Sequence, residues 1–108
     1  MNRVAITGAG TINAIGHSVK ETFANMTEGL CGIGPLIFRD VDRLDIKIGG
    51  QVKDFDPTTV FNRQQLSLYD RVTQFTLIAA RQAINQSGII FSGELAAKSG
   101  VVLGTAGG

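Results

Sequence analysis

Two short apolar runs that lead straight into glycine-rich loops restrict the fold of this chain more than any other feature. Residues 3–7 end in Gly8-Ala9-Gly10, and residues 99–103 end in Gly104-Thr105-Ala106-Gly107-Gly108. The apolar residues of these runs are consecutive and do not alternate with polar ones, which is typical of strands buried on both faces of a mostly parallel sheet. The sequence therefore predicts an α/β fold in which both runs are strands of one sheet.

Helical periodicity predicts two amphipathic helices between these runs. Ser18 and Glu21 have the spacing of a capping box and Gly29 provides a C-terminal stop, which predicts a helix over 18–28. A second helix, over 66–86 and ended by Gly88, has an apolar arc of about 200° and is expected to pack between two layers. Its opposite arc carries polar side chains, so it is not a membrane span: Arg71, Gln74, Arg81, Gln82 and Asn85.

Two weaker patterns lie between the helices. Residues 45–53 predict a strand with a bulge or bend at Gly49-Gly50, near the edge of a sheet. Asp56 followed by Pro57 predicts a short helical turn, because proline is favoured at the first helical position. Residues 31–44 have no sustained period, so we expect no regular element there.

Composition excludes several classes of protein. The chain has 108 residues, 44% of them hydrophobic and 18% charged, with a net charge of +1, which is the size and balance of one globular domain. Its basic residues are scattered, so we expect no nucleic-acid partner. No apolar run reaches the roughly 18 residues of a membrane span, and the start has no signal-peptide pattern. We therefore expect a soluble, cytoplasmic protein that does not contact a membrane.

Cysteine and histidine are too few for a disulfide or a zinc site. The only cysteine is Cys31 and the only histidine is His17, so we expect no metal and no cofactor. Apolar neighbours favour a packing role for Cys31 over a nucleophilic one. His17 directly precedes a predicted helix, which favours a surface or capping role over catalysis.

Three further motifs have structural explanations. The loop over residues 7–16 lacks the glycine that a dinucleotide-binding fingerprint requires where Asn13 stands, so a structural turn is favoured and a nucleotide-binding module is the outside alternative. Asp70 and Arg71 begin the long helix, where an acidic residue complements the helix dipole more often than it forms an active-site pair. The loop over residues 104–108 has no phosphate-binding lysine but remains a candidate for lining a site.

Five short motifs follow one another in order along the chain: Arg3-Val4-Ala5-Ile6-Thr7-Gly8-Ala9-Gly10, Gly29-Leu30-Cys31-Gly32-Ile33, Gly49-Gly50-Gln51-Val52-Lys53-Asp54-Phe55, Asp70-Arg71-Val72-Thr73-Gln74-Phe75 and Gly104-Thr105-Ala106-Gly107-Gly108. In order and spacing they resemble the start of β-ketoacyl-acyl carrier protein synthases of the type II, elongating kind. The resemblance implies a thiolase-like fold and a homodimer. It also implies that residues 1–108 are an incomplete N-terminal segment, without condensing activity of its own.

The resemblance also implies a reaction and its partners. Such enzymes condense an acyl thioester with malonyl-acyl carrier protein, with decarboxylation, in fatty-acid biosynthesis, so the implied partner is acyl carrier protein carrying acyl and malonyl groups. The family's active-site cysteine and two histidines lie beyond residue 108. Ala106 matches a position that lines the acyl pocket, often with a larger residue, and is the predicted substrate-binding residue. A non-catalytic chain-length-factor-like partner and a polyketide or nodulation-type ketosynthase remain alternatives.

Overall fold

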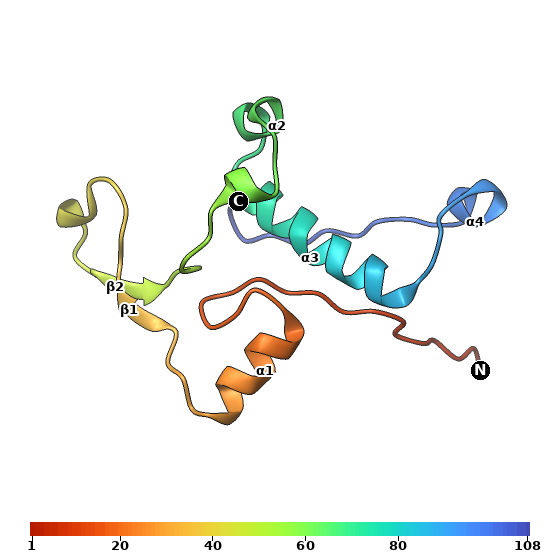
Figure 1. Ribbon diagram of the computed structural model, residues 1–108, viewed down its shortest axis with the longest axis horizontal. Helices are drawn as coiled ribbons and strands as arrows, with labels where there is room; N and C mark the ends of the chain where they lie inside the picture. The colour runs from red at the N-terminus through yellow and green to blue at the C-terminus, as the bar shows by residue number, and fades with distance from the viewer.

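A computed structural model describes residues 1–108 and places one long helix at the centre of the chain (Figure 1). The elements follow in the order α1 (Val19–Thr27), β1 (Ile33–Pro35), a 3₁₀ turn (Val41–Arg43), β2 (Ile48–Gly50), a second 3₁₀ turn (Pro57–Thr59), α2 (Arg63–Leu68), α3 (Arg71–Ser87) and α4 (Gly93–Ala97). The chain thus contains both helices and strands, although its strands are short. None of the helices combines the length and apolar character that crossing a membrane requires.

Local capping explains where α1 begins and ends. The Ser18 hydroxyl accepts a hydrogen bond of 3.1 Å from the backbone N–H of Glu21, and the Glu21 carboxylate accepts one of 3.1 Å from the N–H of His17. Gly29 ends the helix with a φ of +73°, a conformation that glycine adopts at little cost. The helix predicted over 18–28 is therefore confirmed to within one residue at each end.

The second predicted helix is two helices, because the chain breaks at Tyr69 and Asp70. The Asp70 carboxylate accepts the N–H of Thr73 at 2.9 Å, and a continuous helix would have directed that N–H to the carbonyl of Tyr69. The Tyr69 carbonyl instead accepts a bond of 3.0 Å from the side chain of Gln74. The prediction of one continuous helix over 66–86 was therefore wrong at Tyr69 and Asp70. The predicted end of the helix at Gly88, which has φ +66°, is confirmed.

Strands β1 and β2 form an antiparallel pair that projects away from α3 (Figure 1). Ile33 lies opposite Gly50, Gly34 opposite Gly49, and Pro35 opposite Ile48. The strand predicted over 45–53 is thus present in a shorter form, and in a two-stranded sheet it is necessarily an edge. Its partner falls in the part of the chain for which the sequence predicted no element.

The two runs predicted as strands of a parallel sheet are extended but belong to no sheet. Neither residues 3–7 nor residues 99–103 make a backbone hydrogen bond to another strand. Their side chains are almost fully exposed, at 93% for Val4, 91% for Ile6 and 94% for Val101. Within residues 1–108 the predicted parallel sheet is therefore not formed, because a strand requires a backbone partner and neither run has one.

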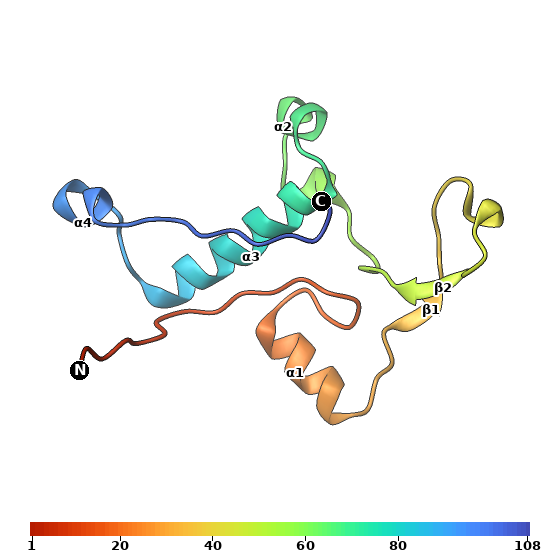
Figure 2. The same ribbon diagram turned by 180° about the vertical axis from the view of Figure 1, so that it is seen from behind.

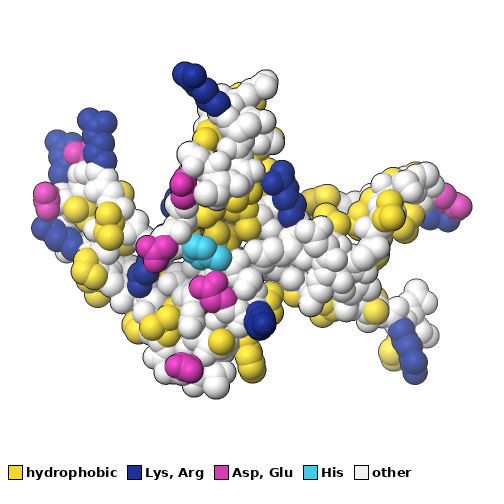
Figure 3. Space-filling view, in the orientation of Figure 1, with side chains coloured by type: hydrophobic (Ala, Val, Ile, Leu, Met, Phe, Trp, Pro, Cys, Tyr) yellow, Lys and Arg dark blue, Asp and Glu magenta, His cyan; other side chains and the backbone are white.

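The chain buries little apolar surface. It exposes 8856 Å², whereas a folded protein of its mass is expected to expose about 5,800 Å². Its radius of gyration of 16.9 Å likewise exceeds the roughly 13 Å of a compact domain of this length. The only buried large apolar residue is Phe61, whose ring packs edge-on against that of Tyr69 with 5.8 Å between the ring centres. Hydrophobic side chains accordingly lie exposed on the projecting parts of the molecule (Figure 3).

Helix α3 holds the segment of residues 8–17 through side-chain amides. Gln82 accepts the N–H of Thr11 at 3.0 Å and donates to the carbonyl of His17 at 2.6 Å. Gln86, one turn further, accepts the N–H of Ala9 at 2.7 Å. These bonds satisfy backbone groups that a neighbouring strand would otherwise pair. The polar arc of α3 is therefore partly an internal surface, and Gln74 on the same arc is buried, at 6% exposure.

Glycine permits this close contact between the N-terminal segment and α3. A Cβ atom on Gly8 would overlap the carbonyl oxygen of Ala83, and one on Gly10 would overlap that of Ala79. The glycine loop predicted as a structural turn thus has a structural role, because only a residue without a side chain lets the two backbones meet. Residues 99–108 pass on another side of the helix, behind α3 in Figure 1 and in front of it in the view from behind (Figure 2).

Candidate functional site

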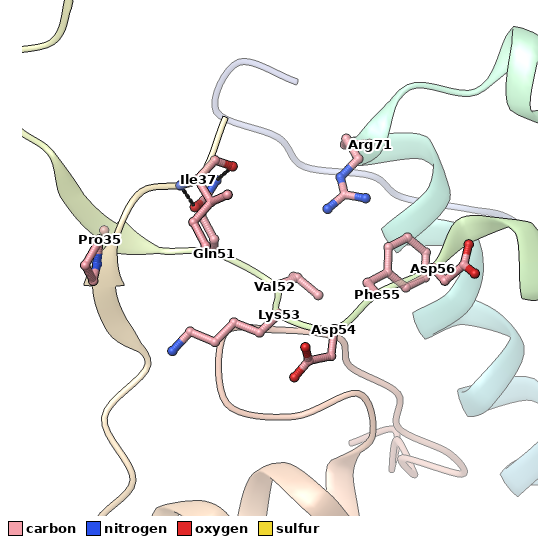
Figure 4. Close-up of a pocket in the computed structure, with 10 residues that line it drawn as sticks. Pro35, Ile37, Gln51, Val52, Lys53, Asp54, Phe55, Asp56 and Arg71 are labelled. Atoms are coloured by element: carbon pink, nitrogen blue, oxygen red, sulfur yellow. Dashed lines mark hydrogen bonds between the residues drawn. The ribbon is translucent and has the colours of Figure 1, made fainter. Parts of the chain in front are cut away.

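Two surface hollows are candidates for a binding site. The larger one lies between the β1–β2 pair, which we call the arm, and the start of α3 (Figure 4). Its volume of about 660 Å³ is in the range of small-molecule sites. It is lined by Pro35, Ile37, Gly49, Gln51, Val52, Lys53, Asp54, Phe55, Asp56 and Arg71. We call it the Arg71 hollow, because this arginine is the residue that α3 contributes to it.

The guanidinium of Arg71 stacks on two aromatic rings. Its central carbon lies 5.1 Å from the ring centre of Phe55 and 4.8 Å from that of Phe75. The rings contact each other edge-on at 5.3 Å. Both arginine distances are within the roughly 6 Å over which a cation is attracted to a ring face. The aromatic pair therefore restricts the orientation of this guanidinium at the wall of the hollow.

His17 supports the same wall from the other side. Its Nε2 lies 2.6 Å from the carbonyl oxygen of Lys53, and its ring contacts Phe55 edge-on at 6.3 Å. Its own carbonyl accepts the bond from Gln82 on α3. His17 thus links α3 to the segment that carries Phe55. This is a positioning role, consistent with the surface or capping role that the sequence favoured over catalysis.

Two aspartates at the rim, Asp54 and Asp56, have local structural features. Asp54 has a left-handed backbone with φ +53°, which aspartate tolerates better than most residues. The carboxylate of Asp56 accepts the hydroxyl of Thr58 at 2.7 Å and its N–H at 2.9 Å, and these two bonds lower the pKa of Asp56. It thereby caps the 3₁₀ turn that begins at Pro57, so the predicted helical turn is confirmed.

The arm and the hollow are joined by one glutamine. Gln51 accepts the N–H of Ile37 at 2.6 Å and donates to its carbonyl at 3.3 Å. This pair of bonds reproduces the pattern of a strand ladder beyond the end of β2. The amide of Gln51 is therefore occupied, which leaves Arg71 as the polar group aimed into the hollow (Figure 4).

The smaller hollow lies beside the C-terminal glycine loop. Its volume is about 300 Å³, and it is lined by Asp70, Val72, Thr73, Thr76, Leu77, Leu103, Thr105 and Gly108. A Cβ atom on Gly108 would lie 2.6 Å from a methyl carbon of Val72, so the loop approaches the helix closely. Ala106, the predicted substrate-binding residue, is exposed and stands in this loop between Thr105 and Gly108 without lining the hollow itself.

The remaining candidates do not form a catalytic group. Cys31 is exposed, and its sulfur has only a 3.8 Å contact to the carbonyl of Ile33, so its predicted packing role is wrong. His17 is bonded elsewhere and gives Cys31 no base. Asp70 caps α3, and its bonds from the Thr73 hydroxyl and N–H lower its pKa, which confirms the predicted structural role. No three acidic, cysteine or histidine side chains converge in a way that would hold a metal.

The contacts of Arg71 with the rings of Phe55 and Phe75 were not predicted from the sequence. Arg71 and Phe75 are four residues apart, a spacing that brings side chains together on a helix and was available as a signal. The contact of Arg71 with Phe55 had no such signal, because Phe55 lies in an irregular segment whose position depends on tertiary structure.

Comparison with known proteins identifies the family. The model of the β-ketoacyl synthase N-terminal domain matches residues 1–108. A 3-oxoacyl-[acyl-carrier-protein] synthase 2 from Synechocystis sp. is 36% identical over 103 residues, and proteins of the same name from Staphylococcus aureus and Coxiella burnetii are 30% and 31% identical over 103 residues. These matches cover 95% of the chain but only 25% of each relative. The chain therefore belongs to the β-ketoacyl synthase family, and its residues 1–108 match the model of the N-terminal domain of that family.

Proposed function

We propose that this chain is the N-terminal part of a 3-oxoacyl-[acyl-carrier-protein] synthase. The match of the family model along residues 1–108 is the observation that carries the proposal, and relatives with this name agree with it. The proposed reaction condenses an acyl thioester with malonyl-acyl carrier protein, with decarboxylation, in fatty-acid biosynthesis. Acyl carrier protein, loaded with the acyl or the malonyl group, is the proposed partner.

The proposed chemistry uses residues beyond position 108. A cysteine thiolate takes the acyl group from the carrier as a thioester, and the carrier thiol leaves. Two histidines assist the loss of CO₂ from the malonyl thioester. The resulting carbanion attacks the acyl carbonyl, a carbon–carbon bond forms, and the cysteine thiolate is released. Covalent catalysis thereby divides one difficult step into two easier ones.

For residues 1–108 we propose a scaffold role within a thiolase-like fold. Support comes from the two extended apolar runs, whose side chains are exposed and whose backbones have no strand partners. The excess of roughly 3,000 Å² of exposed surface over that of a compact domain points the same way. We propose that further strands and helices of the same domain cover these runs, and that the intact protein is a soluble, cytoplasmic homodimer.

We further propose that Ala106 lines the acyl pocket. It stands in the glycine loop beside the smaller hollow, where the loop is close to Val72. Because alanine is smaller than the aliphatic residue that the family often has there, the pocket would accept a longer or bulkier acyl chain.

An assay of the full-length protein tests the proposed function. With acyl- and malonyl-acyl carrier protein we expect a 3-oxoacyl product and an equal amount of CO₂, and no product from the 108-residue chain alone. Absence of product together with absence of an acylated cysteine would contradict the proposal. Activity that appeared only after a competent synthase was added would identify a chain-length-factor-like partner instead.

A further inference from the structure

The Arg71 hollow has several features of a binding site. Arg71 contributes a permanent positive charge and five N–H donors in a planar fork. Its guanidinium is stacked on Phe55 and Phe75, so the side chain does not need to order itself when a ligand arrives. The hollow beside it holds about 660 Å³.

No carboxylate of this chain neutralises Arg71. The two ion pairs of the chain join Arg39 to Asp40 and Lys98 to Glu94, both far along the chain from this arginine. Figure 4 shows the carboxylates of Asp54 and Asp56 at the rim, directed away from the guanidinium. Asp56 is moreover engaged by Thr58. The donors of Arg71 therefore face the hollow with their capacity unused.

The remaining lining residues indicate which chemical groups a ligand would carry besides its negative charge. Pro35, Ile37, Val52 and Phe55 supply apolar surface, whereas the amide of Gln51 is occupied by the backbone of Ile37. The ammonium of Lys53 extends away from the guanidinium (Figure 4). A ligand complementary to these walls has one oxyanion for the guanidinium fork and an apolar portion for the rest.

We infer that the Arg71 hollow binds an oxyanion, a carboxylate or a phosphate, through Arg71, with the apolar part of the same group against Val52 and Ile37. Planar guanidinium groups bind such oxyanions through two parallel hydrogen bonds, which adds geometric selectivity to the charge. Two sources carry this chemistry: a soluble anion, or an acidic side chain from another part of the intact protein.

Titration of the full-length protein distinguishes the two sources. The probes are inorganic phosphate and phenyl phosphate, with binding measured by calorimetry for the wild type, for Arg71→Gln and Arg71→Lys, and for the control Lys20→Gln on exposed α1, away from the hollow. If the source is soluble, we expect phenyl phosphate to bind more tightly than phosphate. Arg71→Gln should weaken binding by about tenfold or more, Arg71→Lys should weaken it less, and Lys20→Gln should change it by less than about twofold.

If the source is an acidic side chain, the wild type will bind neither probe saturably. Its melting temperature should then fall on acidification through the carboxylate range, because an ion pair that lowers a carboxyl pKa is lost as pH falls through that pKa. Arg71→Gln should reduce this dependence, whereas Lys20→Gln should retain it in full. Circular dichroism checks that each variant is folded, and Arg71→Lys provides a second variant should the glutamine variant unfold. Absence of probe binding together with equal pH dependence in wild type and Arg71 variants would overturn the inference.

Discussion

The side-chain amide of Gln82 donates a 2.6 Å hydrogen bond to the backbone carbonyl of His17, which joins the middle of α3 to the loop before α1. The same amide accepts the N–H of Thr11. Gln82→Met keeps the length of the side chain but leaves both backbone groups without this partner. We expect the free energy of unfolding of the intact protein to fall by about 2 kcal/mol, measured by urea denaturation.

A matched control is Gln64→Met on α2, whose side chain is exposed and makes no hydrogen bond. This change should leave stability within about 0.5 kcal/mol of the wild type. Equal effects of the two substitutions would show that the Gln82 bonds do not stabilise the protein.

Gly10 should not tolerate a side chain. A Cβ atom there would overlap the carbonyl oxygen of Ala79, and because backbone atoms cannot rotate away, the segment would have to move off α3. We expect Gly10→Ala to lower the free energy of unfolding by about 2–3 kcal/mol. Gly34→Ala is the control, because nothing lies within 4 Å of its added methyl group. A Gly10→Ala protein as stable as the control would refute the close contact.

Asp70 should stabilise α3 only when it is ionised. Hydrogen bonds from Thr73 lower its pKa below the ordinary value, so its contribution is complete above about pH 5 and is lost as pH falls through the lowered pKa. Asp70→Ala should therefore reduce the melting temperature by a few degrees at neutral pH, and the difference should shrink below about pH 4. Asp45→Ala, which removes a carboxylate outside any helix, should change the melting temperature little at either pH. A difference for Asp70→Ala that did not depend on pH would contradict this account.

Ala106→Ile tests the proposed acyl pocket in the full-length enzyme. The larger isoleucine side chain should reduce the length of the longest acyl chain that the enzyme accepts. The ratio of kcat/KM for long-chain acyl substrates to kcat/KM for short-chain ones should fall by about tenfold or more. Ala97→Ile places the same bulk on exposed α4 and should leave the ratio unchanged. An unchanged chain-length profile in Ala106→Ile would remove Ala106 from the pocket.

Features decided by neighbouring residues could be predicted from the sequence. Ser18, Gly29, Asp56 and Gly88 act on backbone groups a few residues away, so the ends of α1, the 3₁₀ turn after Asp56 and the end of α3 follow from local chemistry. The break at Asp70 is local too, but its cap lies inside a periodic apolar pattern that concealed it.

Features decided by distant residues could not be predicted in the same way. Strand β1 exists because Ile33–Pro35 meets Ile48–Gly50, and three residues are too few for a period. Gln74 is buried although a helical wheel assigns it to the polar arc, and its side chain donates to the carbonyl of Tyr69, just after α2. The Arg71 hollow likewise depends on Phe55, which tertiary packing brings to α3.

The hydrogen bonds of Gln82 and Gln86 also bear on the order in which the chain becomes structured during synthesis. They join residues that are 71 and 77 positions apart in the chain. At about 5–20 residues per second, the N-terminal segment is synthesised roughly 4–15 seconds before these glutamines. Until those glutamines are made, the backbone N–H groups of Ala9 and Thr11 have no partner on α3, so this segment can dock only after the helix has been synthesised.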